Sequence, residues 1–464
     1  MSAATLHEYD AAVVGAGPAG LRAAECLARG GQRVLLVDRA ELGGLCLNAG
    51  CIPTKSLLHS AALYDDARRA VRSGILAASG LSFRWEEAIE AAYATVGNLR
   101  AALAAKMRRL GVEFRRADAT ISECAESGVT LRLDGTCGSV PDTAAAAAAD
   151  IVRARRVLLA TGAVSRTLPQ ETADACDALG VPTAEFLDCI TAFEAPPRRV
   201  CVVGAGAVGL ECAAFFAMIG SEVAVVECAP EILPPLDSEL APHLRRALAQ
   251  TGERGVTFRL ASRLDAALLR EIAPDVVVPA IGRIGSDGSF VAADDAFRTA
   301  RPNVWAAGDN TGRCMLAHAA QRMGELAAKE MLRDAGVASG ERETLDAERI
   351  PWVVFGQCEA AGVGPTEAAL RARGVEPVVR ILPAVYSGRV VAERGMRAPG
   401  AVKLLAMPDG RLASVHAACP HAGEFIGTAA AQICAGATLE DVVRTVLPHP
   451  TASELLRDAA FDVR

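Results

Sequence analysis

The sequence has 464 residues, which is too long for a single hydrophobic core and predicts two to four domains. The composition is that of a soluble globular protein, with 51% hydrophobic and 22% charged residues, and the net charge of −7 argues against a nucleic-acid-binding surface. We expect neither an export signal nor a membrane span, and therefore a cytoplasmic protein whose 14 cysteines are mostly reduced.

The chain opens with a glycine-rich turn between two apolar strands. In AAVVGAGPAG a strand leads into Gly15, Gly17 and Gly20, a helical stretch follows, and the strand RVLLVD ends at Asp38. Such glycines permit a tight turn and the close approach of a pyrophosphate, and the acid hydrogen-bonds a ribose hydroxyl. One such turn alone is weak evidence for a dinucleotide site.

Two cysteines, Cys46 and Cys51, follow directly in GGLCLNAGCIPTK. A helical turn would bring their sulfurs together, and the helix N-terminus would favour a thiolate, so a redox pair is one interpretation. A zinc site is a second, but the nearest further ligands, His416, Cys419 and His421, lie far away in sequence. An inert buried pair is the third.

The middle of the chain contains three further buried strands, at 155–163, 275–282 and 303–309, each ending in a turn. The low-complexity segment at 134–150 is predicted to be a surface excursion.

A second copy of the glycine-rich design lies between these strands. VCVVGAGAVG carries Gly204, Gly206 and Gly209, and the strand VAVVE ends at Glu227. In both copies the acid lies 18 residues after the last glycine. Two dinucleotide sites in one chain predict electron transfer between two cofactors, typically a flavin and a nicotinamide.

From about residue 340 the pattern changes to alternating strands and helices, which predicts an antiparallel α/β domain. Its end, HPTASE, places His449 five residues before Glu454. This stretch is a good helix N-terminus.

Taken together, these motifs resemble the flavin-dependent pyridine nucleotide-disulfide oxidoreductases, and among them most of all the dihydrolipoamide dehydrogenases. The resemblance runs nearly end to end and rests on GGLCLNAGCIPTKSLLHSA, both glycine-rich turns, ATG at 160–162, AAGDNTGRCMLAHAA at 306–320, and HPTASE. It implies an α/β fold with two Rossmann-like domains and a C-terminal α+β dimerisation domain. The implied boundaries are 1–152 with 284–338 for FAD, 153–283 for NAD, and 339–464 for the dimer interface.

The resemblance also assigns the cofactor residues. FAD would be bound by Gly15, Gly17, Gly20, Asp38, Ala119, Gly162, Asp309, Met315, Leu316, Ala317 and His318. NAD would be bound by Gly204, Gly206, Gly209, Glu227 and Gly282. An acid at the end of the second strand suits the 2′-hydroxyl of NAD and repels the 2′-phosphate of NADP.

By the same resemblance, Cys46 exchanges with a dihydrolipoyl substrate and Cys51 contacts the flavin, while Lys55 pairs with Glu211 beside the flavin ring. His449 and Glu454 would serve the cysteines of the other subunit of a homodimer, and the partner would be a lipoyl-carrying protein. No metal is expected.

The chain departs from the family at Leu45, at Cys358 where proline is usual, in IGSD after Arg283, and in a shortened stretch between Pro235 and Asp275. Two alternatives remain: an NAD(P)H-dependent reductase of another disulfide, resembling glutathione reductase, and a catalytically idle paralog that binds FAD and NAD. The C-terminal AAFDVR lacks the paired cysteines expected of mercuric reductase or of the large thioredoxin reductases.

Overall fold

The structure is a computed structural model that describes residues 7–135 and 150–461. The low-complexity prediction at 134–150 falls almost wholly outside the described residues. The chain divides into two compact units, Met1–Thr54 with Ala91–Arg166 and Arg283–Ala347, and Lys55–Glu90 with Thr167–Gly282 and Glu348–Arg464. Two long helices, α3 (Cys51–Arg72) and α4 (Trp85–Arg109), contribute residues to both units.

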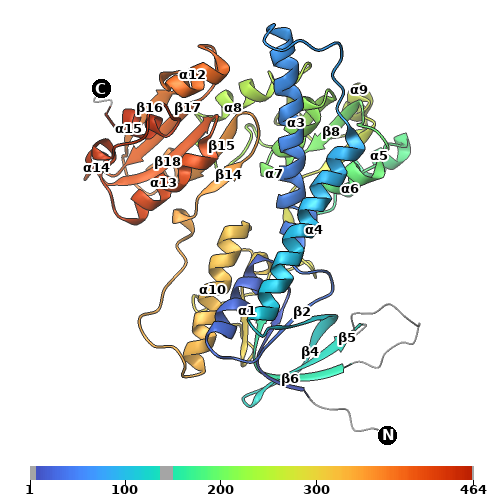
Figure 1. Cartoon of the computed structure of the whole chain (residues 1–464), viewed down its shortest axis with the longest axis vertical. Coiled ribbons are helices and arrows are strands. Elements are labelled where there is room, and N and C mark those ends of the chain that lie inside the picture. Colours follow the sequence, from blue (N-terminus) through green and yellow to red (C-terminus); the bar gives the residue numbers. More distant parts are fainter. Residues whose placement is uncertain (1–6, 136–149, 462–464) are drawn as a thin grey trace. The chain divides into compact units, whose positions relative to one another are not determined.

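The first unit is built on a seven-stranded sheet (Figure 1). Its order is β3-β2-β1-β6-β5-β4, and β13 also pairs with β6. Strands β3, β2, β1, β6 and β13 are parallel, whereas β4 and β5 are antiparallel to their neighbours. The bounds are β1 (His7–Val14), β2 (Val34–Asp38), β3 (Glu113–Arg116), β4 (Asp118–Ala125), β5 (Gly128–Asp134), β6 (Asp150–Leu159) and β13 (Val304–Ala306).

The central strands of this sheet are parallel because helices connect them and cover their apolar residues. Val13 pairs with Leu36 on one side and with Leu158 on the other, and all three are fully buried. Helices α1 and α10 pack against each other beside the sheet (Figure 1). The remaining elements are α1 (Pro18–Arg29), α2 (Gly44–Ala49), α10 (Ala317–Asp334), η1 (Asp309–Thr311), η2 (Ala347–Arg349), and a small sheet of β7 (Ala163–Ser165) and β12 (Arg283–Gly285).

The second unit begins with a parallel four-stranded sheet of order β10-β9-β8-β11. Its strands are β8 (Arg199–Val203), β9 (Glu222–Val226), β10 (Val256–Arg259) and β11 (Val276–Pro279). Helices α5 (Gln170–Leu179), α6 (Phe186–Ala192), α7 (Ala207–Met218), α8 (Ala241–Leu248) and α9 (Ala266–Ile272) connect or flank them. The stretch predicted to be short, 235–275, contains only α8, β10 and α9.

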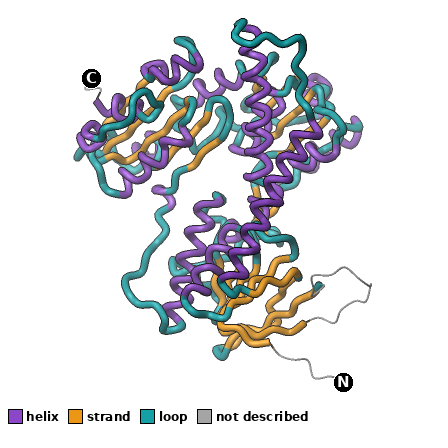
Figure 2. Tube along the Cα trace, viewed as in Figure 1, coloured by secondary structure: helices purple, strands orange, loops and turns teal. Residues whose placement is uncertain are grey.

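An antiparallel five-stranded sheet of order β14-β15-β18-β17-β16 completes the second unit. Figure 2 shows helices packed along these strands. The strands are β14 (Trp352–Val354), β15 (Glu359–Val363), β16 (Val378–Pro383), β17 (Ala401–Ala406) and β18 (Leu412–Cys419). The helices are α11 (Glu367–Ala372), α12 (Gly388–Arg394), α13 (Ala422–Cys434), α14 (Leu439–Arg444), α15 (Glu454–Phe461) and the short η3 (Ala384–Tyr386). Within the described part of the chain, no helix is long and apolar enough to cross a membrane.

Candidate active site and nucleotide sites

The first glycine-rich turn joins β1 to α1, and both backbone groups of its residue Ala16 are hydrogen-bonded. The N–H of Ala16 donates to Asp38 Oδ2 at 2.6 Å, and the N–H of Gly43 donates to the carbonyl of Ala16 at 2.9 Å. The other oxygen of Asp38 accepts the N–H of Ala40 at 2.8 Å. The acid predicted to bind a ribose therefore also fixes the turn.

The second turn, between β8 and α7, repeats this geometry. Glu227 Oε2 accepts the N–H of Ala205 at 2.7 Å, and the N–H of Leu233 donates to the carbonyl of Ala205 at 3.0 Å. Burial would raise the pKa of Glu227, but hydrogen bonds from the amides of Ala205 and Ala229 outweigh it and lower that pKa. The carboxylate therefore stays ionised and available to accept hydroxyl hydrogen bonds.

The glycine positions in the two turns show where a ligand would lie. A Cβ on the third glycine, Gly20 or Gly209, would meet the carbonyl of the first at 1.8 or 2.0 Å. A Cβ on the middle glycine, Gly17 or Gly206, would meet nothing closer than 3.9 Å. These middle glycines begin α1 and α7 without any side-chain cap. Open space at an uncapped helix N-terminus fits a pyrophosphate, so both turns fit a dinucleotide.

Asp309, the first residue of η1 after β13, fits a polar ligand in the first unit. Burial raises the pKa of its carboxyl, and Arg283 offsets this only in part. In the neighbouring Asn310, Nδ2 donates to the carbonyl of Leu159, but Oδ1 is buried without a partner among the described residues. Polar groups desolvated in this way suit the hydroxyl-bearing chain of a flavin nucleotide.

The two cysteines lie on two helices rather than on one helical turn. Cys46 belongs to α2, and Cys51 is the first residue of the 22-residue α3, with Gly50 between them. A Cβ on Gly50 would lie 2.9 Å from the carbonyl of Leu45 and 3.3 Å from the Cα of Cys46, so a larger residue would push the helices apart. The N-terminus of α3 stabilises negative charge at Cys51.

Cys46 lines a cavity of about 210 Å³ in the first unit. Its wall is mainly apolar, and Arg22, Glu25 and Lys106 add charges. Lys106 Nζ lies 2.6 Å from Glu25 Oε2. The apolar and neutral residues that complete the lining are Pro18, Leu21, Gly43, Leu47, Ile52, Leu103, Met107 and Gln321.

Lys55 and Glu211 form the expected ion pair, with Nζ 2.7 Å from Oε2. The other oxygen of Glu211 accepts the N–H of Phe355 at 3.2 Å, and Lys55 Nζ lies 4.9 Å from the centre of the Phe355 ring. Glu211 is buried in α7 and orients the ammonium. The role of the pair beside a flavin stays a prediction.

His449 and Glu454 meet at the start of α15. His449 Nδ1 lies 3.0 Å from Glu454 Oε1, and the side chain of His449 is 78% exposed. The N–H of Thr451 donates to Glu454 Oε2 at 2.9 Å and, together with His449, lowers the pKa of Glu454. The stretch thus begins a helix, and it also brings an imidazole and a carboxylate into contact.

The other predicted cofactor residues lie at the ends or edges of elements. Ala119 pairs with Leu133 in the β4–β5 hairpin. An added Cβ at Gly162 or Gly282 would meet open space. Met315 is 41% exposed, and Leu316, Ala317 and His318 form the start of α10.

The histidines of the possible zinc group have other partners. His416 Nδ1 accepts the N–H of Asp237 at 2.9 Å, and His421 Nε2 lies 2.7 Å from Glu393. Sequence reasoning missed Ala16 and Ala205, which act through backbone groups, and Asp237, which acts through its N–H and its carboxylate. The only available signal for the Asp237 site was Lys403, one of four lysines in the chain.

Comparison with known proteins decides the family. Residues 9–324 match the sequence model of the pyridine nucleotide-disulphide oxidoreductases, and residues 350–460 match the dimerisation domain of the same family. The chain belongs to this family. Membership establishes a flavoprotein oxidoreductase that uses FAD and a nicotinamide dinucleotide, with a C-terminal dimerisation domain.

Similar curated proteins cover nearly the whole chain. Dihydrolipoyl dehydrogenase 3 of Pseudomonas aeruginosa is 31% identical, over 99% of this chain and 98% of its own. The dihydrolipoyl dehydrogenase of the same organism is 33% identical, over 97% and 96%. That of Chlorobaculum tepidum is 30% identical, over 98% and 97%.

Solved structures of the same fold include LpdA from Mycobacterium tuberculosis, with a TM-score of 0.80 and 22% identity over 99% of this chain and all of that one. The flavoprotein disulfide reductase RclA from Escherichia coli has a TM-score of 0.78 and 22% identity, over 98% and 100%. At this identity the likeness shows the fold alone.

Proposed function

We propose that the protein is a dihydrolipoyl dehydrogenase that oxidises protein-bound dihydrolipoyl groups and reduces NAD+. The observation that carries the proposal is the mainly apolar wall of the cavity that Cys46 lines, because an aliphatic dithiol arm would pack against such a wall. Support comes from full-length relatives of that name at 30 to 33% identity. The carrier protein and the cytoplasmic location remain predictions.

The chemistry begins at Cys46. A substrate thiolate attacks Cys46 Sγ in the Cys46–Cys51 disulfide, and Cys51 leaves as a thiolate. The second substrate thiol then displaces Cys46, so that the substrate ends as a disulfide and both cysteines as thiols. Gly15, Gly17, Gly20 and Asp38 would hold FAD, which when bound would supply the two-electron chemistry that couples the reduced cysteines to NAD+. The overall balance is dithiol plus NAD+ giving disulfide, NADH and a proton.

His449 would take and return the protons of this exchange. Its Nδ1 is engaged by Glu454, so the exposed Nε2 is the atom that would face the thiols. The family's dimerisation domain supports a homodimer in which His449 serves the partner's cysteines.

Asp38 and Glu227 would bind the ribose hydroxyls of FAD and NAD, respectively. Glu227, as an ionised carboxylate, favours NAD over the 2′-phosphate of NADP.

The test is anaerobic mixing of the purified flavoprotein with dihydrolipoamide, followed by NAD+. We expect a long-wavelength thiolate-to-flavin absorption band that NAD+ discharges as NADH appears. Cys46→Ser should retain the flavin and abolish dithiol turnover, because no exchange thiol remains. Cys124→Ser, at another half-buried cysteine, should remain active. Full activity of Cys46→Ser would refute the mechanism.

A second candidate is an NAD(P)H-dependent reductase of a charged disulfide, favoured by Arg22, Glu25 and Lys106 in the cavity wall. In that case dihydrolipoamide would leave the flavin unchanged, whereas NADH or NADPH would reduce it.

A further inference from the structure

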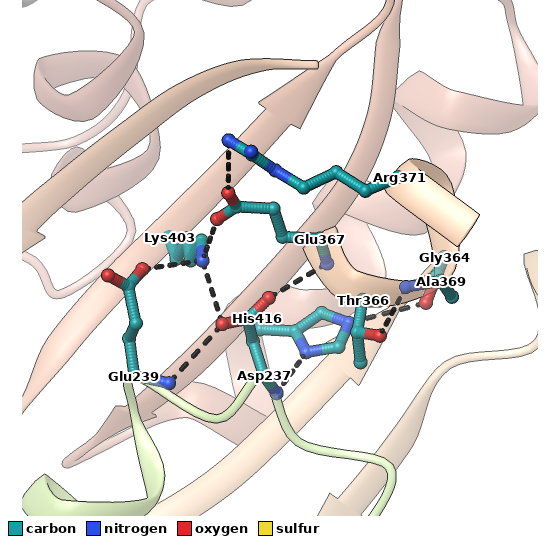
Figure 3. A network of polar contacts seen from close by, with 9 residues as sticks. All are labelled: Asp237, Glu239, Gly364, Thr366, Glu367, Ala369, Arg371, Lys403 and His416. Atoms are coloured by element: carbon teal, nitrogen blue, oxygen red, sulfur yellow. Dashed lines mark hydrogen bonds and ion pairs between the residues drawn. The ribbon is translucent and has the colours of Figure 1, made fainter. Parts of the chain in front are cut away.

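Five residues of the second unit form a polar cluster around the buried Lys403, called here the Lys403 cluster: Asp237, Glu239, Glu367, Lys403 and His416 (Figure 3). Lys403, on β17, is 1% exposed, and its Nζ donates to Asp237 Oδ1 at 2.7 Å, to Glu239 Oε2 at 2.6 Å and to Glu367 Oε2 at 2.5 Å. A buried ammonium needs hydrogen-bond acceptors, and of the three acids around Lys403 only Asp237 is itself buried, whereas the side chain of Glu239 is mostly exposed.

The three carboxylates place one oxygen each within 4.8 Å of one another, an arrangement that can also hold a metal ion. Here the ammonium of Lys403 supplies the cation. Burial would lower the pKa of Lys403, but its three hydrogen-bonded acids raise it, so the charge persists at neutral pH.

Asp237 is the member on which the other elements converge (Figure 3). Its N–H donates to His416 Nδ1 on β18 at 2.9 Å, and its Oδ2 accepts the N–H of Glu367 at the start of α11 at 2.9 Å. His416 Nε2 lies 3.2 Å from the carbonyl of Gly364, which makes Nε2 the protonated nitrogen and Nδ1 the acceptor. Backbone and side chain of Asp237 are thus both held by the C-terminal domain.

A short path of backbone hydrogen bonds leads from Asp237 to the second glycine-rich turn. The neighbouring Leu236 donates its N–H to the carbonyl of Leu233 at 2.9 Å, and Leu233 donates to the carbonyl of Ala205. Leu233 has a φ of 51° and is buried. A leucine adopts this left-handed conformation only where its surroundings impose it.

The first glycine-rich turn has an equivalent backbone hydrogen bond, which allows the two repeats to be compared. There the residue that holds the carbonyl of the turn is Gly43, which directly precedes the redox helix α2. In the second half the equivalent residue is Leu233, and the segment that follows leads to Asp237. The segment after Gly43 therefore carries the cysteines, whereas the equivalent segment after Leu233 carries Asp237, which fastens it to the C-terminal domain.

We propose that Asp237 and Lys403 are positioning residues for the nicotinamide nucleotide, because they fix the segment that holds the second turn in its binding shape. The inference rests on the proposed use of the second turn as the NAD site. The two residues touch no substrate. They act through Leu233 and Ala205.

The test uses the FAD-loaded protein and the variant Asp237→Asn, which keeps size and removes the charge that Lys403 binds. Glu239→Gln is the matched control, because its side chain is 56% exposed and lies off the path to Leu233. We expect Asp237→Asn to weaken NAD+ binding by calorimetry, and to raise the KM for NAD+, by about 5- to 10-fold. The rate of flavin reduction by dihydrolipoamide and kcat should change less than about twofold, and Glu239→Gln should match the wild type.

A wild-type measurement keeps the inference falsifiable if Asp237→Asn fails to fold. We expect the amides of Leu233 and Asp237 to exchange hydrogen slowly before any nucleotide is added. Protection that appears only with NAD+, or an unchanged NAD+ affinity in a folded Asp237→Asn protein, overturns the inference. If the wild type binds no nicotinamide nucleotide, the proposed function fails instead.

Discussion

At the scale of single residues, His449 and Glu454 form the pair for which we propose a role in proton transfer. Glu454 accepts hydrogen bonds from the imidazole and from the N–H of Thr451, so its carboxylate has a fixed position. A fixed carboxylate selects one imidazole tautomer and stabilises the imidazolium that forms when a thiol is deprotonated.

This arrangement predicts the effect of Glu454→Gln. The variant loses the negative charge beside His449, so we expect flavin reduction by dihydrolipoamide to slow by about 10-fold or more. Reduction of the flavin by NADH should not change, because that half-reaction does not use His449. Stopped-flow absorbance measures both rates. Glu440→Gln, at an exposed acid of α14, serves as the control, and equal rates in the two variants would contradict the role of Glu454.

At the scale of elements, the strand–turn–helix unit occurs twice, and the three glycines have the same steric roles in both copies. The first and third glycines of each turn are required by contacts within the protein, whereas the middle one leaves open space at the helix start. A substitution at the middle glycine should therefore affect ligand binding without affecting folding, whereas one at the first or third glycine should disturb the turn itself.

Gly206→Ala tests this separation. The added methyl group meets no protein atom within 4 Å and the backbone φ of −77° suits alanine, so the melting temperature and the bound flavin should be unaffected. Because the methyl group would occupy the expected pyrophosphate position, the KM for NAD+ should rise about 10-fold or more.

Gly427→Ala, in α13, is the control, since its Cβ also meets open space. A Gly206→Ala protein with unchanged NAD+ kinetics would show that the pyrophosphate lies elsewhere.

At the scale of the whole molecule, the dimerisation domain carries several exposed apolar side chains. The largest exposures are those of Tyr386, Met396, Val446 and Phe461, with 67%, 71%, 92% and 61%. Exposed apolar side chains of a dimerisation domain are candidates for burial against the second subunit. Val446 lies three residues before His449 in the same loop.

Val446→Asp should therefore weaken the homodimer. We expect a larger monomer fraction by light scattering and a parallel loss of dihydrolipoamide oxidation, because His449 would no longer reach the partner's cysteines. NADH-dependent reduction of an artificial acceptor should persist in the monomer. Val337→Asp, at a half-exposed valine of the first unit, is the control. A monomeric variant that still oxidises dihydrolipoamide would contradict a shared active site.

Local patterns in the sequence determined the two turns, the strands around them, the cysteine pair, the antiparallel C-terminal domain and the helix that starts at Glu454. These features are readable because each depends on residues close together in the chain, with fixed spacing and distinctive types. The break between α2 and α3 at Gly50 was not predicted, because glycine spacing alone does not distinguish one helical turn from two helices.

Only the tertiary structure revealed the backbone clamps at Ala16 and Ala205 and the Lys403 cluster. Each clamp joins a predicted acid, Asp38 or Glu227, to a peptide group, and peptide groups leave no signature in residue type. The cluster joins Asp237 to Lys403 across 166 residues. A lysine within an apolar strand pattern indicates that it is buried with acidic partners, but the sequence does not show which acids these are. Long-range pairing of this kind is decided by how strands and helices pack, and that packing is absent from any local stretch of sequence.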